Sequence, residues 1–353
     1  MDNHISFNHA IAMLESQHMQ YAVLPLGGEW KAIVTRYGGR LMGPFKGDDG
    51  ESVLWANAAW KNEADFKAFV DAREWNLGGE RFWVNPELRF FCEAPELFDA
   101  TYTVQGELDP GNYAIKQSDR GVELAQSVML KDLNNGAKKS FDIRRRYAPA
   151  LNPLRGLKGL RDLNVDFCGY VQDIELQDTL PETKMYLEPW ILTQVIPNGK
   201  FITPIFGDFD FADYYEPVNE MQHVCDGYAE LDVTGDRKYK VAYRSAQTFG
   251  RMAYVKPSGD GWHLMVRNYY NDPSIPYCSE PWGNLGDRHC STYYYNDNGL
   301  SGGFAEFENG GATIGLDANR DRCYNTTSLW FFYGSQDDIA SIMKYLLGID
   351  YRF

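Results

Sequence analysis

The sequence has 353 residues, of which 44% are hydrophobic and 24% are charged, the normal balance of a globular protein with a sizeable core. Its formal net charge of −15 argues against a nucleic-acid partner, because proteins that bind a phosphate backbone normally carry a basic surface. The apolar stretches are all shorter than the ~18 residues of a membrane span, so no membrane partner is expected.

Two helices are predicted in the first 75 residues, with strands between them. Residues 6–17 predict a short helix with a polar start. Residues 21–26 and 30–37 then read as strands. Residues 62–74 predict the second helix, because their apolar side chains follow the i, i+3, i+4 spacing of one helix face.

Most of the remaining chain reads as short strands separated by Gly, Asn, Asp and Pro. The aromatic content of 15% and the 33 glycines also favour β-structure with tight turns. The last predicted element is a helix over residues 336–347, which Ser335 can cap and Gly348 can end. The predicted strands cover residues 101–106, 122–130, 141–148, 165–176, 261–270, 290–297 and 302–309.

This succession of strands without alternating helices predicts a mostly β fold, a large antiparallel sandwich or barrel with a few short helices. It does not match repeated β-α-β units. The chain has neither a repeat of fixed period nor a linker rich in Pro and Ser, so we expect a single domain over residues 1–353.

Neither a cofactor nor a metal ion is expected from the sequence motifs. The six cysteines are scattered without a Cys-x-x-Cys pair, and the sequence shows no secretory signal, so we expect reduced thiols and a cytoplasmic protein. Phosphate-binding, dinucleotide-binding and zinc-helix motifs are missing. Asp208, Asp210 and Asp213 are spaced like a calcium loop but lack its later bidentate acid.

Two Gly-Gly motifs place an arginine near the start of the chain. They are Tyr-Gly-Gly-Arg at residues 37–40 and Gly-Gly-Glu-Arg at residues 78–81. Paired glycines permit positive φ and close backbone approach, so Arg40 and Arg81 can project into a cleft and hold hydroxyl or carboxylate groups. The alternative is a turn with a surface arginine.

The strand at residues 302–309 carries two carboxylates on one face. Alternate side chains of a strand share a face, so Glu306 and Glu308 lie on the same side as Phe304. Adjacent like charges raise the pKa of one group and can supply a base beside an acid. The alternative is the solvated outer face of an edge strand.

Two further arginines lie among apolar or aromatic residues. Arg145 shares the apolar face of residues 141–148, so it either pairs with a buried acid or lines a site. Arg267 leads into an aromatic stretch that includes Trp282. Flat aromatic rings beside polar groups suit a sugar, whereas the alternative is an aromatic loop packed on its own sheet.

Four segments together resemble the galactose-mutarotase-like superfamily, and more narrowly a bacterial branch of it. They are YGGRLMGPFKGDDGESVLWAN, NLGGERFWVNPE, HLMVRNYYNDPSIPYCSEPWG and STYYYNDNGLSGGFAEFENGGA, spread over roughly residues 20–330. The resemblance implies a supersandwich of large antiparallel sheets packed face to face, with a carbohydrate site across a concave sheet.

The resemblance also implies roles for individual residues. Glu308 best matches the glutamate that serves as base in aldose 1-epimerases, and Glu306 is the alternative. Arg40 matches a substrate-holding arginine, and Arg81 occupies the analogous place in the second motif. The substrate-binding candidates are Arg40, Glu80, Arg81, Trp83, Arg145, Arg267 and Trp282, and the catalytic candidates are Glu308 and Glu306.

The sequence departs from those epimerases in its histidines. Those enzymes use two histidines in the first half and middle of the chain, one as the general acid, but this sequence has none between His18 and His223. A Tyr, Asp or Arg could replace the acid.

Our first hypothesis is a carbohydrate-active enzyme, epimerase-like or lyase-like, that uses a glutamate base on a small-molecule or oligosaccharide substrate. The arginines suggest a sugar acid, because bidentate contacts between arginine and carboxylate are strong. The alternatives are a non-catalytic carbohydrate-binding sandwich and, more distantly, a structural or partner-binding sandwich.

Overall fold

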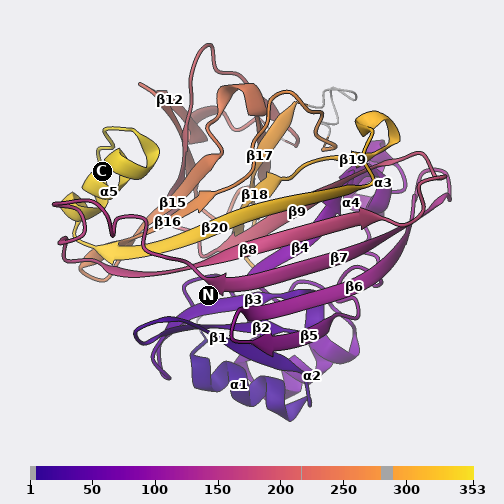
Figure 1. Cartoon of the computed structure of the whole chain (residues 1–353), viewed down its shortest axis with the longest axis horizontal. Helices are drawn as coiled ribbons and strands as arrows, with labels where there is room; N and C mark the ends of the chain where they lie inside the picture. Colours follow the sequence, from indigo (N-terminus) through magenta and orange to yellow (C-terminus); the bar gives the residue numbers. More distant parts are fainter. Residues whose placement is uncertain (1–4, 216, 280–288) are drawn as a thin grey trace.

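Two antiparallel β-sheets of ten strands each form the body of the protein in the computed structural model, which describes residues 5–215, 217–279 and 289–353 (Figure 1). The first sheet has the order β1-β2-β3-β4-β9-β18-β17-β14-β11, and β19 pairs with β9. The second sheet has the order β12-β13-β10-β15-β16-β20-β8-β7-β6-β5. The prediction of a mostly antiparallel β-sandwich is therefore confirmed.

The strands of the two sheets have the following bounds. The first sheet contains β1 (Tyr21–Gly27), β2 (Trp30–Thr35), β3 (Leu41–Lys46), β4 (Glu80–Asn85), β9 (Tyr186–Val195), β11 (Phe211–Asp213), β14 (Tyr239–Arg244), β17 (Cys290–Asn296), β18 (Ala305–Gly310) and β19 (Ile314–Gly315). The second contains β5 (Ala114–Ser118), β6 (Gly121–Lys131), β7 (Lys138–Pro149), β8 (Asp166–Asp178), β10 (Gly199–Pro204), β12 (Gln222–Cys225), β13 (Tyr228–Val233), β15 (Arg251–Ser258), β16 (Gly261–Asn268) and β20 (Arg322–Gly334).

The three predicted helices are confirmed as α1 (Phe7–Ser16), α2 (Glu63–Asp71) and α5 (Gln336–Leu347). The α5 helix is capped as expected, because the Ser335 side chain accepts from the Asp338 N–H and Gly348 takes a left-handed conformation. Two short helices that the sequence analysis did not predict, α3 (Glu87–Phe90) and α4 (Phe98–Thr101), follow β4.

The strand predicted over residues 101–106 is wrong. Thr101 ends α4, Tyr102 forms only an isolated bridge with Cys92, and turns follow. The Thr103 N–H bonds to the Phe91 carbonyl, so this β-like segment pairs locally with the short helical region rather than extending a sheet.

The main apolar core lies between the two sheets. Phe307 of β18 faces Phe201 of β10 with ring centroids 6.1 Å apart, which shows that the odd-numbered side chains of β18 point toward the second sheet. Glu306 and Glu308 therefore point to the outer face of the first sheet. This alternation positions the candidate site.

Helices cover parts of the outer faces. The apolar stripe of α5 packs on Leu264 and Val266 of β16. In Figure 1, α1 and α2 lie at the bottom beside β1, β2 and β3, where they share an apolar cluster with Met42 and Phe45. Within the described part of the chain, the helices lack the combination of length and apolar character needed to cross a bilayer. The single-domain organisation stays a prediction.

Candidate functional site

A cavity of about 290 Å³ lies over the outer face of the first sheet, at β4, β9, β14, β17 and β18. The short helices α3 and α4 also contribute to its walls. Its aromatic lining consists of Trp75, Phe98, Tyr102, Trp190, Tyr215, Tyr295 and Phe304. Its charged lining consists of Arg81, Glu87, Asp99, Lys238, Lys240, Glu306 and Glu308.

Strand register brings three of the predicted site residues onto this surface. Leu192 of β9 pairs with Arg81 of β4 on one side and with Glu308 of β18 on the other. Residues paired across antiparallel strands share a face, so all three side chains meet on the outer side of the sheet. Glu306 reaches the same surface because it lies two residues before Glu308.

Arg81 and Glu306 form a buried ion pair in the cavity. Both Nη atoms of Arg81 donate to the Glu306 carboxylate, and the Nη2–Oε2 distance is 3.2 Å. The guanidinium also lies over two indole rings, 4.2 Å from the centroid of Trp83 and 5.0 Å from that of Trp75. The charge of Arg81 is thus matched by a carboxylate and by aromatic faces.

Lys240 of β14 supplies the second buried cation. Its Nζ atom donates to Glu87 Oε2 at 2.8 Å and lies 3.9 Å from Glu308 Oε2. It also lies 4.6 Å from the ring centroid of Trp190. Burial lowers the pKa of Lys240, but the nearby Glu308 and Glu87 outweigh that effect and hold the pKa above its ordinary value. Lys240 is therefore charged at neutral pH.

Glu308 is the carboxyl group left over in this arrangement. Arg81 pairs with Glu306, and Lys240 pairs with Glu87. The three buried carboxyl groups at the cavity therefore outnumber the two buried cations by one. Glu308 accepts a hydrogen bond from Trp190 Nε1 at 2.8 Å. Burial raises its pKa to about 8, against the lowering effect of Lys240 and with a further contribution from the negative charge of Glu306.

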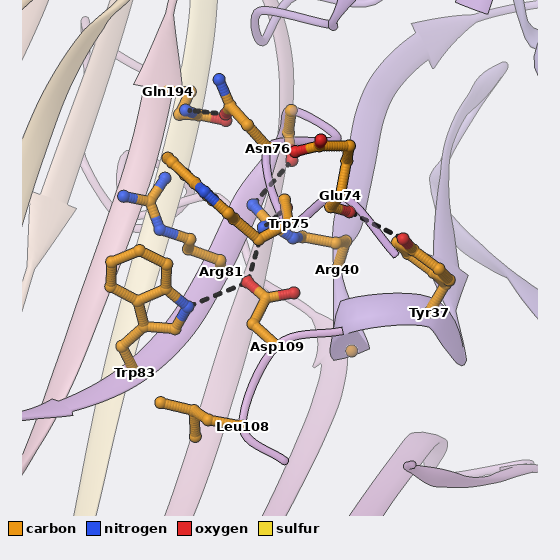
Figure 2. A network of polar contacts seen from close by, with 12 residues as sticks. Tyr37, Arg40, Glu74, Trp75, Asn76, Arg81, Trp83, Leu108, Asp109 and Gln194 are labelled. Carbon is orange, nitrogen blue, oxygen red and sulfur yellow. Dashed lines mark hydrogen bonds and ion pairs between the residues drawn. The ribbon is translucent and has the colours of Figure 1, made fainter. Parts of the chain in front are cut away.

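Arg40 lies behind the cavity wall rather than in it. Its Nη2 atom lies 2.6 Å from Asp109 Oδ2 and also donates to the backbone carbonyl of Trp75. Trp83 Nε1 donates to the same Asp109 oxygen at 2.9 Å. Figure 2 shows Asp109 between Arg40 and Trp83, with Arg81 beyond the indole ring of Trp83. Arg40 and Trp83 therefore brace the wall that carries Trp75 and Arg81.

Glu80 and Arg267 form a polar network inside the sandwich. Arg267 donates to Glu80, and the Tyr170 hydroxyl donates to the same Glu80 oxygen at 2.8 Å. Glu80 shares the face of Phe82, which points to the core, whereas the adjacent Arg81 points outward. Glu80 and Arg267 were predicted to bind the substrate, but both lie between the sheets.

Arg145 also lies between the sheets. Its Nη1 atom donates to the Gly39 carbonyl at 2.9 Å, and its Nη2 atom donates to the Tyr147 hydroxyl. The sequence left open whether Arg145 pairs with a buried acid or lines a site. Its hydrogen-bond partners are a carbonyl and a phenol, so neither interpretation fully holds. Trp282 lies outside the described residues.

Four cavity residues were not predicted from the sequence: Lys240, Glu87, Trp75 and Trp190. Lys240 did carry a signal, because a lysine inside the otherwise apolar strand segment 239–243 resembles the anomaly noted for Arg145. Glu87 ends the motif NLGGERFWVNPE but was not selected. Trp75 and Trp190 could be assigned to the cavity only from the strand pairing and the packing of the loop before β4.

The fold and the site define an antiparallel β-sandwich with an aromatic cavity built around a surplus buried carboxyl group. No model of a known protein family matches the sequence, and no curated protein is significantly similar to it.

Solved structures similar to this chain include the Slr1438 protein from Synechocystis sp. PCC 6803, at 10% identity, with 89% of this chain and 94% of that chain covered and a TM-score of 0.47. A galactose mutarotase-like protein from Lactobacillus casei ATCC 334 is similar at 10% identity over 89% of this chain and all of that chain (100%), with a TM-score of 0.44. Another from Clostridium acetobutylicum is similar at 10% identity over 89% and 98% of the two chains, with a TM-score of 0.43.

Proposed function

We propose that this protein is a carbohydrate-active enzyme of the epimerase or mutarotase type, with Glu308 as the group that accepts and returns a proton. The observation that carries the proposal is the surplus of one carboxyl group on the cavity floor. Glu306 and Glu87 have cations as partners, whereas Glu308 has an indole N–H and a lysine 3.9 Å away. A carboxyl group with a raised pKa is suited to proton transfer near neutral pH.

The aromatic lining supports a sugar as the substrate. The C–H face of a pyranose ring packs on flat aromatic side chains, and its hydroxyl groups hydrogen-bond to polar groups between them. Trp75 is half-buried at the wall of the cavity, and Trp190 lies on the floor beside Glu308. The cavity thus offers ring surfaces and hydrogen-bonding groups together.

The charge pairing favours a neutral sugar over a sugar acid. The arginines that suggested an anionic substrate already have carboxylate partners, Glu306 for Arg81 and Asp109 for Arg40. A uronate would add a negative charge beside the surplus carboxyl Glu308. Because like charges at short range are unfavourable in a buried site, a lyase acting on uronates fits this cavity less well.

The proposed reaction is the opening and reclosing of a hemiacetal ring. The ionised Glu308 accepts the proton of the anomeric hydroxyl group, the bond between the anomeric carbon and the ring oxygen breaks, and the ring oxygen takes a proton from a general acid in the cavity, which recovers it when the ring closes. The carbonyl carbon of the open chain then rotates and the reverse steps close the ring on the other face. Protons and electrons balance over the cycle, so no oxidant or reductant is required.

The test compares anomeric exchange with and without the protein. Freshly dissolved α-anomers of glucose, galactose and mannose are followed by polarimetry, and exchange at equilibrium is followed by NMR, with glucuronate and galacturonate as anionic comparisons. We expect Glu308→Gln to lower the catalysed rate about 100-fold or more. Glu182→Gln, at an exposed position, serves as the matched control.

A non-catalytic binding protein would give a different result. It would show thermal stabilisation by sugars without any acceleration of anomeric exchange by the wild-type protein. A structural sandwich would show neither effect. Equal rates for the wild type and Glu308→Gln would rule out Glu308 as the proton-transfer group.

A further inference from the structure

Lys240 is a buried cation whose hydrogen-bonding capacity is only partly used. Its residue exposure is 2%, although an ammonium group has three donors and is costly to remove from water. Among the described residues it donates one hydrogen bond, to Glu87. Lys240 lines the cavity together with Glu308, so a ligand in the cavity can use its remaining donor capacity.

The spacing between Lys240 and Glu308 suits a reaction at two oxygen atoms bonded to one carbon. Ring opening of a hemiacetal needs a base at the anomeric hydroxyl group and an acid at the ring oxygen. Both oxygens are attached to the anomeric carbon, so the two protein groups must lie within a few ångströms of each other. Lys240 Nζ and Glu308 Oε2 are 3.9 Å apart.

We propose that the Lys240 ammonium group donates the proton that the ring oxygen accepts when Glu308 removes the proton of the anomeric hydroxyl group. This inference rests on the proposed function. As the bond between the anomeric carbon and the ring oxygen breaks, one proton passes to Glu308 and one leaves Lys240. Ring closure returns both protons, so the enzyme regains its starting state.

Glu87 is the positioning residue in this scheme. It lies at the start of α3, directly after β4, and holds the Lys240 Nζ atom at 2.8 Å. The Trp190 indole both donates to Glu308 and lies under the Lys240 ammonium group, with 4.6 Å from Nζ to the ring centroid. The Trp190 ring and the Glu87 carboxylate thus fix Lys240 and Glu308 relative to each other.

The other charged and titratable groups near this pair come from several elements. Arg81 of β4 and Glu306 of β18 lie near Glu308 and pair with each other. The phenol groups facing the two carboxylates Glu87 and Glu308 are Tyr102, Tyr214 and Tyr215. Burial keeps the pKa of each of these phenols well above its ordinary value, so they remain neutral when Glu308 ionises.

The experiment separates a proton donor from a fixed positive charge. Lys240→Arg keeps the charge, but a guanidinium group does not release its proton in proteins. Lys240→Met removes both charge and proton. The double variant Lys240→Met with Glu87→Gln removes the ion pair as a unit, so it avoids leaving Glu87 buried without a partner. Lys116→Met, at an exposed position of β5, is the control.

The rate of anomeric exchange is measured at pH 8 with the aldohexose that the wild type accelerates most, and folding is checked by circular dichroism and thermal melting. We expect Lys240→Arg and the double variant to lose about 100-fold or more in kcat/KM, and the control to match the wild type. If Lys240→Arg or the folded double variant stays within about three-fold of the wild type, Lys240 is not the donor and only this inference fails. If the wild type accelerates no sugar, the proposed function fails and this inference with it.

Discussion

Arg81 and Glu306 are 225 positions apart in the sequence and meet as a two-pronged ion pair on the outer face of the first sheet. Three adjacent strands, β4, β9 and β18, bring them together. The pair removes one carboxylate and one arginine from the groups available to a substrate. Glu308 then faces the Lys240 ammonium group at 3.9 Å, which donates its hydrogen bond to Glu87 instead.

The first prediction concerns the stability contributed by this pair. Arg81→Met leaves the Glu306 carboxylate buried without its partner, so we expect the free energy of unfolding to fall by about 3–5 kcal/mol. The double variant Arg81→Met with Glu306→Gln removes both charges and should recover most of that loss. Urea denaturation of the two variants and the wild type measures the difference. A single variant as stable as the double one would contradict the interpretation of a coupled buried pair.

The second prediction concerns pH. Because burial raises the pKa of Glu308 to about 8, most of the protein carries a protonated Glu308 at pH 7, which cannot accept a proton. We therefore expect kcat/KM for anomeric exchange to rise with pH through a midpoint near 8. In Lys240→Met the midpoint should move upward, because Lys240 lowers the pKa of Glu308.

The pH profile also has a result that would contradict this assignment. Activity that is flat from pH 6 to pH 9, or that falls as pH rises through 8, would show that an ionised Glu308 is not the working form. Glu182→Gln should leave the midpoint unchanged, since that side chain is exposed and separate from the cavity lining.

The third prediction concerns the aromatic wall. The Trp75 indole is half-buried, lies 5.2 Å from the Trp83 ring, and has its backbone carbonyl held by Arg40. Its neighbour Asn76 is held in turn by Gln194 at 2.9 Å, as Figure 2 shows. A ring fixed in this way can pack on a sugar without much loss of entropy on binding.

We expect Trp75→Ala to weaken sugar binding by about 1 kcal/mol, or about five-fold in Kd, with a small change in kcat. Titration calorimetry measures the affinity. Tyr324→Ala is the control, because Tyr324 is 66% exposed on β20 of the second sheet. Equal loss of affinity in both variants would argue against a stacking role for Trp75.

The fourth prediction concerns the second Gly-Gly motif. Gly79 has a φ of 71°, and a Cβ atom there would lie 2.2 Å from the Leu41 carbonyl oxygen. Gly28 has a similar φ of 56°, but a Cβ atom there would meet nothing within 4 Å. The two positions therefore separate the effect of close backbone approach from that of the left-handed conformation.

Gly28→Ala should cost about 1 kcal/mol of unfolding free energy, whereas Gly79→Ala should cost several times more, because β3 and β4 must move apart. Thermal and urea unfolding provide the comparison. Similar losses of unfolding free energy at both positions would show that the close backbone approach at Gly79 adds nothing to the cost of the substitution.

Local patterns in the sequence were sufficient for the elements of the fold. Helix spacing and caps identified α5 to its terminal residues, and period-two alternation placed Glu306 and Glu308 on one face of β18. These predictions succeed because side-chain direction within a helix or a strand depends only on neighbouring residues. The strand predicted over residues 101–106 was wrong because the composition of this segment favours β-structure, whereas in the fold it pairs locally with the short helical region instead of a sheet edge.

The roles of the arginines could not be obtained in this way. Arg40 and Arg81 both follow Gly-Gly motifs, yet Asp109 holds Arg40 behind the cavity wall and Glu306 holds Arg81 in the cavity. Arg267 pairs with Glu80 between the sheets. Each of these partners lies at least 69 positions away along the chain. The tertiary arrangement of strands and loops decides which acid meets which base, since Glu306 and Glu80 lie on strands and Asp109 lies in a turn before β5.

The amino-acid sequence by itself determined a strand-rich chain, the shared face of Glu306 and Glu308, and paired glycines that permit close backbone approach. The tertiary structure decided that Lys240 and Glu87 join Glu308 at one cavity, while Glu80 and Arg267 lie inside the sandwich. The physical reason is that hydrophobic periodicity is local, whereas the pairing of buried charges depends on which strands lie side by side.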